Sequence, residues 1–216
     1  MATLKVPIAV EDHAQGPESA DVTLVEYGDY ECPYCGQAYP IVQQVQKHFG
    51  KRLRLVFRNF PLSEMHPDAE AAAEVAEFAG AQGKFWEMHD KLYENQERLG
   101  EALYLDLAEK LKLSTTALHQ ALEQRTFEAR VRADFKGGAR SGVNGTPTFF
   151  VNGHRHDGSF DFETLVSAIH QPWERRKAPS GGQKLAHLSE STYHVCPGLT
   201  MLRKERENVS FLREGH

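Results

Sequence analysis

Two cysteines separated by two residues stand where a predicted strand gives way to a predicted helix. The segment reads Cys32-Pro33-Tyr34-Cys35, and two cysteines at this spacing on a first helical turn can close a disulfide. Free backbone N–H groups and the positive end of the helix dipole stabilise a thiolate at Cys32. Such a thiolate attacks disulfides, and a second cysteine resolves the mixed disulfide. We therefore expect Cys32 to be an exposed nucleophile and Cys35 a buried resolving thiol.

A carboxylate, Glu26, precedes the first cysteine by six residues and lies within an apolar run expected to form a strand over 22–27. Burial there raises the pKa of a carboxyl group, which can then accept or relay the proton of the resolving thiol. The alternative is a solvated glutamate at the edge of the sheet.

A proline stands before the apolar run 148–151, in the pair Thr146-Pro147, which follows Gly142 and Gly145. A bond that precedes proline can be cis, and a cis proline turns the chain sharply and removes a backbone donor. An ordinary trans proline at the start of a strand is the alternative, and base rates alone favour it.

A zinc half-site is the main alternative for the paired cysteines. Zinc needs two further ligands, and the chain offers only Cys196 and eleven dispersed histidines, of which His154 and His156 lie two apart. An incidental pair without a role is the remaining alternative. His66, which precedes Pro67, is interpreted as an ordinary residue at the start of a helix rather than as a catalytic group.

The surrounding pattern predicts a small mixed sheet interrupted by a block of helices. Strands are expected over 22–27, 53–57, 148–151 and 154–158, with an edge strand in 3–10. Helices are expected over 35–49, kinked at Pro40, and over 69–79, 85–92, 103–111, 114–122, 127–136 and 162–169, with Gly137-Gly138 ending the sixth.

Three segments in this order resemble the DsbA-like branch of the thioredoxin superfamily. They are Val25–Cys35, Phe57–Leu62 and Gly142–Gly153, and the resemblance extends over roughly residues 4–170. It implies an α/β thioredoxin-like fold, with a central mixed sheet flanked by helices. Residues 1–61 and 141–171 would form the core, and 62–140 an inserted helical domain.

The resemblance also implies roles for single residues. Cys32 is the implied nucleophile and Cys35 the resolving cysteine, while Glu26 matches the buried acid of the family. Pro147 is implied to be cis and to lie beside the cysteines. The residues expected to contact an extended substrate are Thr146, Pro147, Pro33 and Tyr34.

One residue departs from the family pattern. Periplasmic oxidases of this branch typically have histidine where this chain has Tyr34, and Cys-Pro-Tyr-Cys is common in glutaredoxins instead. Tyr34 brings no positive charge, and Asp29 and Glu31 oppose a thiolate by like-charge repulsion. We therefore expect a reduction potential of about −200 to −230 mV, rather than the roughly −120 mV of a strongly oxidising DsbA.

Composition narrows the class of protein further. The chain has 216 residues, 40% of them hydrophobic, and a net charge of −5, values that fit a globular protein without a membrane span or a nucleic-acid partner. The N-terminus shows no secretion signal, so we expect a cytoplasmic protein, or a periplasmic one if a signal was removed. Residues 172–216 are expected to be a flexible tail, with Cys196 an incidental thiol or one for an intermolecular disulfide.

The function predicted from the sequence is therefore thiol-disulfide exchange on protein or peptide substrates. No metal or bound cofactor is expected, and glutathione or a thioredoxin-type system is the candidate redox partner. Two alternatives stay open. One is a glutathione-dependent transferase or isomerase on a similar core, against which Cys35 argues. The other is a non-enzymatic module that binds peptides or a metal.

Overall fold

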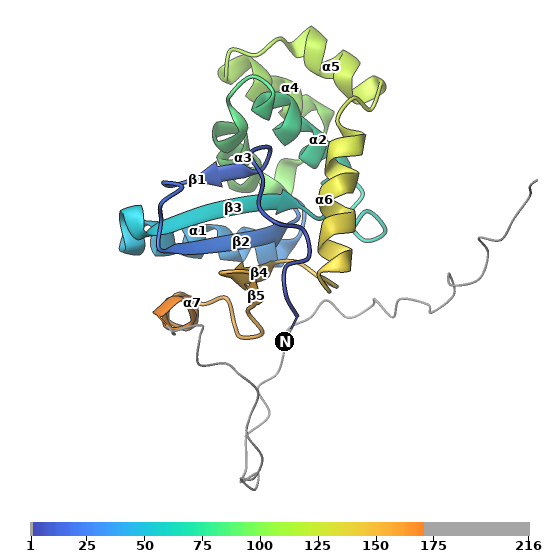
Figure 1. Cartoon of the computed structure of the whole chain (residues 1–216). Coiled ribbons are helices and arrows are strands. Elements are labelled where there is room, and N and C mark those ends of the chain that lie inside the picture. Colours follow the sequence, from blue (N-terminus) through green and yellow to red (C-terminus); the bar gives the residue numbers. More distant parts are fainter. Residues whose placement is uncertain (1, 171–216) are drawn as a thin grey trace, which may run out of the picture.

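The computed structural model describes residues 2–170 and contains a five-stranded mixed sheet in the order β1-β3-β2-β4-β5. The strands are β1 His13–Gln15, β2 Val22–Gly28, β3 Leu53–Asn59, β4 Thr148–Val151 and β5 His154–Arg155. β2 and β3 run parallel, and the other neighbouring strands pair antiparallel. The predicted fold class, a mixed sheet with helices and an inserted helical region, is confirmed (Figure 1).

Seven α-helices accompany the sheet in the described part of the chain. They are α1 Pro33–Phe49, α2 Ala69–Gly80, α3 Phe85–Glu94, α4 Glu101–Lys110, α5 Thr115–Glu123, α6 Glu128–Arg140 and α7 Phe162–His170, with short 3-10 turns η1 Gly50–Arg52 and η2 Gln96–Arg98. None of these helices is both long and apolar enough to cross a membrane.

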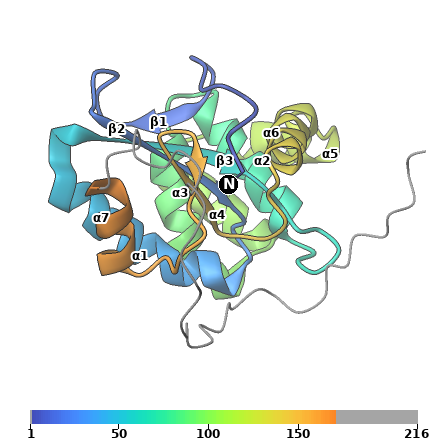
Figure 2. The same cartoon turned by 60° about the horizontal axis from the view of Figure 1, so that its bottom comes forward.

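Alternating strand residues build a separate apolar layer on each face of the sheet. Leu24, Leu55 and Phe149 face α1 and α7. Val25 and Phe150 face the opposite side, where α6 and the N-terminal segment pack (Figure 2). Since side chains alternate along a strand, β2 can be buried on both faces and is the central strand of the core.

Helices α2–α6 lie between β3 and β4 in the chain, within the predicted insertion at 62–140 (Figure 1). These helices enclose an apolar cluster, which includes the aromatic residues of α3 and extends to the two cysteines. The division of the chain into a core and a separate inserted domain stays a prediction. The expected tail, 172–216, lies outside the described residues.

The edge strand expected in 3–10 was a wrong prediction. Only Thr3 forms an isolated bridge there, to His154, and β1 takes the edge position beside β3. The carbonyl groups of Val6 and Pro7 accept hydrogen bonds from the Arg58 guanidinium at 3.0 and 2.9 Å. These carbonyls are satisfied by a side chain, so the pairing that Thr3 and Leu4 make with the β4–β5 hairpin does not continue as a strand.

The helix expected to end at Gly137-Gly138 continues to Arg140, which corrects a second prediction. A Cβ atom on Gly138 would lie 2.7 Å from the ring of Phe60 and 3.0 Å from that of Tyr27. Glycine at this position therefore lets α6 approach the sheet closely and does not end the helix. The strand expected over 154–158 is also shorter, because β5 ends at Arg155.

Candidate active site

The paired cysteines occupy the start of α1, as predicted. Cys32 is the N-cap residue, Pro33 begins the helix, and Cys35 lies in its first turn. The backbone N–H of Cys32 donates to the carbonyl oxygen of Asp29 at 3.2 Å, which fixes the turn between β2 and α1. Both cysteines are free thiols. Cys196, the third cysteine, lies outside the described residues.

Cys32 is not the exposed sulfur that the sequence predicted, because neither cysteine has any accessible surface. The Cys32 thiol points at the carbonyl oxygen of Thr146, with 3.4 Å between Sγ and the oxygen. The Gln96 side chain approaches the same turn and donates to the carbonyl oxygens of Tyr30 and Cys32 at 2.7 and 2.9 Å. Two segments distant in the sequence thus cover a residue that the helix alone would leave open.

The two thiols nevertheless differ sharply in acidity. A hydrogen bond from the Cys35 thiol, together with backbone N–H groups of Cys35 and Tyr34, lowers the pKa of Cys32 to about 6 despite its burial. Burial, and then the neighbouring Cys32, raises the pKa of Cys35 well above its usual value. At neutral pH the site therefore holds one thiolate and one thiol.

The Thr146–Pro147 peptide bond is cis, as the resemblance implied, and its loop lies against Cys32 through the Thr146 carbonyl. The Thr146 hydroxyl oxygen is buried without a hydrogen-bond partner among the described residues. Its proton is therefore available to the Cys32 thiolate, whose pKa it helps to lower.

The other residues expected to contact substrate lie beside the two cysteines, between them in the chain or in the loop that covers Cys32. Pro33 is exposed, and Tyr34 and Pro147 are half-buried. Tyr34 also packs against the apolar cluster of the inserted helices. Their contact with a substrate stays a prediction.

Glu26 is buried in the middle of the sheet, as predicted, with 3% of its surface exposed. It pairs with Phe57 of β3 and Phe149 of β4, so the alternative of a solvated edge residue is wrong. Burial raises the pKa of Glu26 to about 8. The charge of an ionised Glu26 in turn contributes to the raised pKa of Cys35, so the two groups interact.

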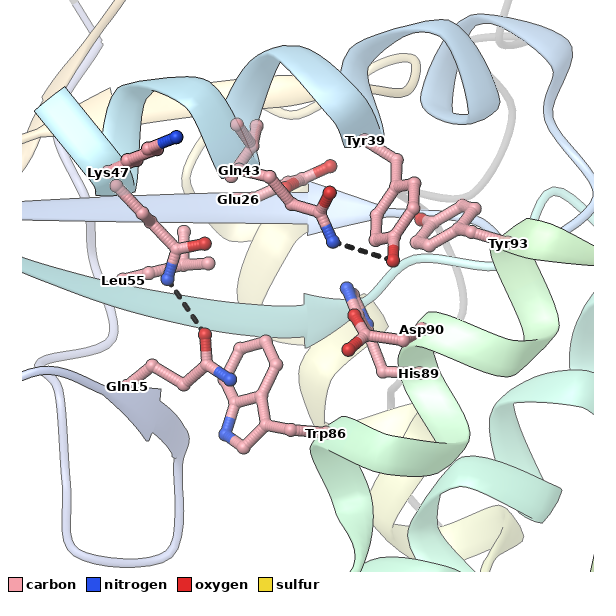
Figure 3. A pocket seen from close by; sticks show the side chains of 12 residues that line it. Gln15, Glu26, Tyr39, Gln43, Lys47, Leu55, Trp86, His89, Asp90 and Tyr93 are labelled. Carbon is pink, nitrogen blue, oxygen red and sulfur yellow. Dashed lines mark hydrogen bonds between the residues drawn. The ribbon is translucent and has the colours of Figure 1, made fainter. Parts of the chain in front are cut away.

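A pocket of about 420 Å³ lies between α1 and α3, and Glu26 is one of its lining residues. Figure 3 shows Glu26 together with Tyr39 from α1 and Asp90 from α3. Glu26 therefore borders a cavity and is not packed on all sides by other side chains. A cavity lined by polar groups can hold water, and water can carry a proton away from Glu26.

Sequence reasoning did not predict that His66 lies at the active-site turn. Its Nδ1 atom lies 2.7 Å from Oδ2 of Asp29, in the turn that precedes the cysteines. The two residues are 37 positions apart in the chain, so no local pattern shows that they meet. Within residues 2–170, no three His, Cys, Asp or Glu side chains gather into a group that could hold a metal ion.

Comparison with known proteins identifies the family of this chain. A family model described as thioredoxin matches residues 9–171, and the chain therefore belongs to the thioredoxin family. BdbD from Bacillus subtilis is 27% identical, with a TM-score of 0.71 over 78% of this chain and 96% of BdbD. A thioredoxin-like oxidoreductase from Silicibacter pomeroyi is 29% identical, with a TM-score of 0.66 over 74% and 91% of the two chains.

Alpha-DsbA1 from Wolbachia pipientis shares the fold, with a TM-score of 0.67 over 77% of this chain and 92% of that one, at only 17% identity. The fold of this chain is thus the thioredoxin-like fold of BdbD and alpha-DsbA1, and its paired cysteines lie at the start of α1 in that fold.

Relatives of known sequence include much longer proteins. Na(+)/H(+) antiporter NhaA 1 from Salinispora arenicola is 48% identical over 167 residues, which are 77% of this chain and 26% of the antiporter. NhaA 1 from Mycobacterium sp. (strain KMS) is 41% identical over 170 residues, 77% of this chain and 28% of that protein. The chain thus spans about a quarter of the length of the curated relatives it matches.

Proposed function

We propose that this protein catalyses dithiol-disulfide exchange on protein substrates through its Cys-Pro-Tyr-Cys site. The observation that carries the proposal is the opposite shift of two adjacent thiols, with the pKa of Cys32 lowered to about 6 and that of Cys35 raised. A nucleophile that is ionised at neutral pH beside a thiol that stays protonated is the arrangement that two-step exchange requires.

The reaction runs in two balanced steps. The Cys32 thiolate attacks one sulfur of a substrate disulfide, which forms a mixed disulfide and releases the other substrate sulfur as a thiolate. Cys35 then passes its proton to ionised Glu26 and attacks the sulfur of Cys32. The second substrate sulfur leaves as a thiolate, and the enzyme keeps the Cys32–Cys35 disulfide. The reverse sequence oxidises a substrate dithiol.

Substrate would reach the site at the exposed start of α1. Pro33 is exposed there and Tyr34 and Pro147 are half-buried, whereas Cys32 itself is covered by the Thr146 loop and Gln96. Attack on a substrate disulfide therefore requires these covering groups to move aside. Glutathione or a thioredoxin-type system is the proposed redox partner.

The experiment is the reduction of insulin by the purified protein in the presence of a thiol reductant, together with trapping of mixed disulfides. We expect Cys35→Ser to accumulate a mixed disulfide with substrate and Cys32→Ser to form none. No insulin reduction and no trapped species would favour a binding module instead. Consumption of glutathione by an electrophile that persists in Cys35→Ser would favour a transferase.

A second candidate function concerns the partner. Because relatives named as Na(+)/H(+) antiporters contain a segment up to 48% identical to this chain, we propose thiols of a membrane transport protein as one substrate class. The Cys35→Ser variant, expressed in the native host, should then trap a membrane protein that mass spectrometry can identify. If every protein trapped by the variant is found outside the membrane fraction of the cells, this candidate substrate class is wrong. The predicted cytoplasmic location stays a prediction, and fractionation of the same cells would test it.

A further inference from the structure

We propose that His66, paired with Asp29, is a positioning residue that stabilises the Cys32 thiolate with a positive charge supplied from outside the Cys-Pro-Tyr-Cys motif. This inference rests on the proposed exchange function, because it concerns the nucleophile of that reaction. The positive charge that Tyr34 cannot provide would then come from the segment between β3 and α2, which contains His66.

The pair is buried beside the active-site turn and held by hydrogen bonds. The Asp29 side chain has no exposed surface, and that of His66 is 11% exposed. Asp29 Oδ2 accepts from the backbone N–H of Leu62 at 2.9 Å and lies 2.7 Å from His66 Nδ1. Asp29 Oδ1 accepts from the backbone N–H of Glu31 at 2.8 Å. A buried carboxyl group needs a hydrogen-bonding or charged partner, and the ring of His66 lies within hydrogen-bond distance to be that partner.

The same aspartate also contacts the two cysteines through its backbone. Its N–H donates to Sγ of Cys35 at 3.4 Å, and its carbonyl oxygen accepts from the N–H of Cys32 at 3.2 Å. His66 therefore reaches the redox turn through one residue that contacts both cysteines. Rotation or loss of the ring would change the charge beside the sulfurs without changing the motif itself.

Charge also couples His66 to the nucleophile. The hydrogen bond with Asp29 raises the pKa of His66, and the charges of Asp29, Cys32 and Glu31 favour the same protonated form. These three groups are anionic when ionised, so each of them holds a proton on the ring. Coupling is reciprocal: a Cys32 thiolate that favours the imidazolium is itself favoured by it to the same extent.

Asp29 acts differently here from what its charge alone suggests. An unpaired carboxylate beside the cysteines would oppose a thiolate by like-charge repulsion. Paired with protonated His66, Asp29 contributes little net charge, and the opposition that the sequence predicted is offset. Loss of the imidazolium would leave the buried carboxylate uncompensated, so the pKa of Cys32 would rise.

The test compares His66→Gln with the wild-type protein. Glutamine retains a donor for Asp29 but carries no charge. We expect the pKa of Cys32, followed by ultraviolet absorbance of the thiolate, to rise by about one unit, and attack on a disulfide at neutral pH to slow by roughly two- to tenfold. The reduction potential should become more negative, since the reduced form loses thiolate stabilisation. At alkaline pH, where Cys32 is ionised in both proteins, the rates should converge, a result that a general loss of structure would not give.

His119→Gln is the matched control. His119 also pairs with a carboxylate, Glu101, at 2.7 Å, but it is 49% exposed and lies on α5. The His119→Gln substitution should leave the pKa of Cys32 unchanged. An unchanged pKa of Cys32 in an active, folded His66→Gln would overturn the inference and leave the exchange function intact. A wild-type protein without exchange activity would instead overturn the proposed function.

A second measurement keeps the inference testable if His66→Gln does not fold. The titration of His66 can be followed by NMR in the reduced and the oxidised wild-type protein. Oxidation removes the Cys32 thiolate, so the pKa of His66 should fall. Equal values in the two redox states would refute the coupling.

Discussion

The backbone N–H of Asp29 donates a hydrogen bond to the sulfur of Cys35, with 3.4 Å between the two atoms. This bond favours a negative charge on Cys35, yet burial raises the pKa of that thiol well above its usual value. The resolving cysteine therefore keeps its proton until a base removes it. Glu26, whose charge acts on the pKa of Cys35 and which borders the pocket between α1 and α3, is the base that we propose for this step.

Replacing Glu26 with glutamine should slow the second step of the exchange and leave the first unchanged. The glutamine amide cannot accept a proton, and a positioned general base contributes about 100-fold or more to such a step. We expect the mixed disulfide with substrate to accumulate in quenched-flow samples at neutral pH. Glu94→Gln, an exposed change on α3, is the control and should behave as wild type. An unchanged rate of resolution in Glu26→Gln would remove Glu26 from the mechanism.

The same substitution should change how stability depends on pH. The pKa of Glu26 is raised from 4.5 to about 8 in the folded protein, so the folded state binds the proton more tightly than the unfolded state. The stability gained in this way is fully present below pH 4.5 and is lost as the pH rises through about 8. Between pH 5 and pH 8 the reduced wild-type protein should lose about 3 kcal/mol relative to Glu26→Gln, measured by urea unfolding. Parallel curves for the two proteins would contradict the raised pKa.

Much of the site could be predicted from sequence because its main parts are local. The apolar run 22–27 and the helix that follows Cys32 place the cysteines at a strand-to-helix junction, and a charged residue within such a run points to a buried acid. The cis proline depended on the resemblance, since base rates favour trans. The covering of Cys32 and the pairing of His66 with Asp29 depend on segments far apart in the chain, which no local pattern connects.

The fold shows the same division between local and distant causes. The helix expected over 114–122 begins at a serine, a residue type that favours helix starts, and the Ser114 hydroxyl oxygen accepts from the N–H of Ala117 at 3.2 Å. β1 was missed because three residues are too short to show an alternating pattern. Gly138 was misinterpreted as a helix end because the rings that require a glycine there belong to β2 and to the residue after β3.

Gly138→Ala should destabilise the protein, although alanine favours helices by about 1 kcal/mol over glycine. The new Cβ would lie 2.7 Å from the ring of Phe60, which is buried and stacked on Phe135 with 4.3 Å between ring centroids. Forcing these rings apart costs roughly 1–3 kcal/mol. Gly137→Ala is the matched control, since its Cβ would meet the Val6 side chain at 3.2 Å and the Tyr27 hydroxyl at 3.7 Å, and no closer atom.

Thermal unfolding of the two variants should therefore separate them. Gly137→Ala should unfold near or above the wild-type temperature, and Gly138→Ala several degrees below it. Equal melting temperatures would show that α6 can move away from the sheet at no cost.

The last prediction concerns the direction of the redox reaction. Tyr34 brings no charge to the start of α1, whereas the charge of His66 comes from the segment before α2 and is shared with Asp29. Because the charges of His66 and Asp29 offset each other, they add no net positive charge beside Cys32, and we expect a potential of about −200 to −230 mV for the wild-type protein. Tyr34→His should add a positive charge at the helix N-terminus, lower the pKa of Cys32 and raise the potential toward that of a strongly oxidising DsbA, about −120 mV. Tyr34→Phe is the control and should leave the potential within about 10 mV of wild type, a change of less than threefold in the exchange equilibrium. Equilibration with glutathione buffers, followed by alkylation of the free thiols, measures all three proteins. A wild-type potential above about −150 mV would show that the charge of His66 outweighs the absence of charge at Tyr34.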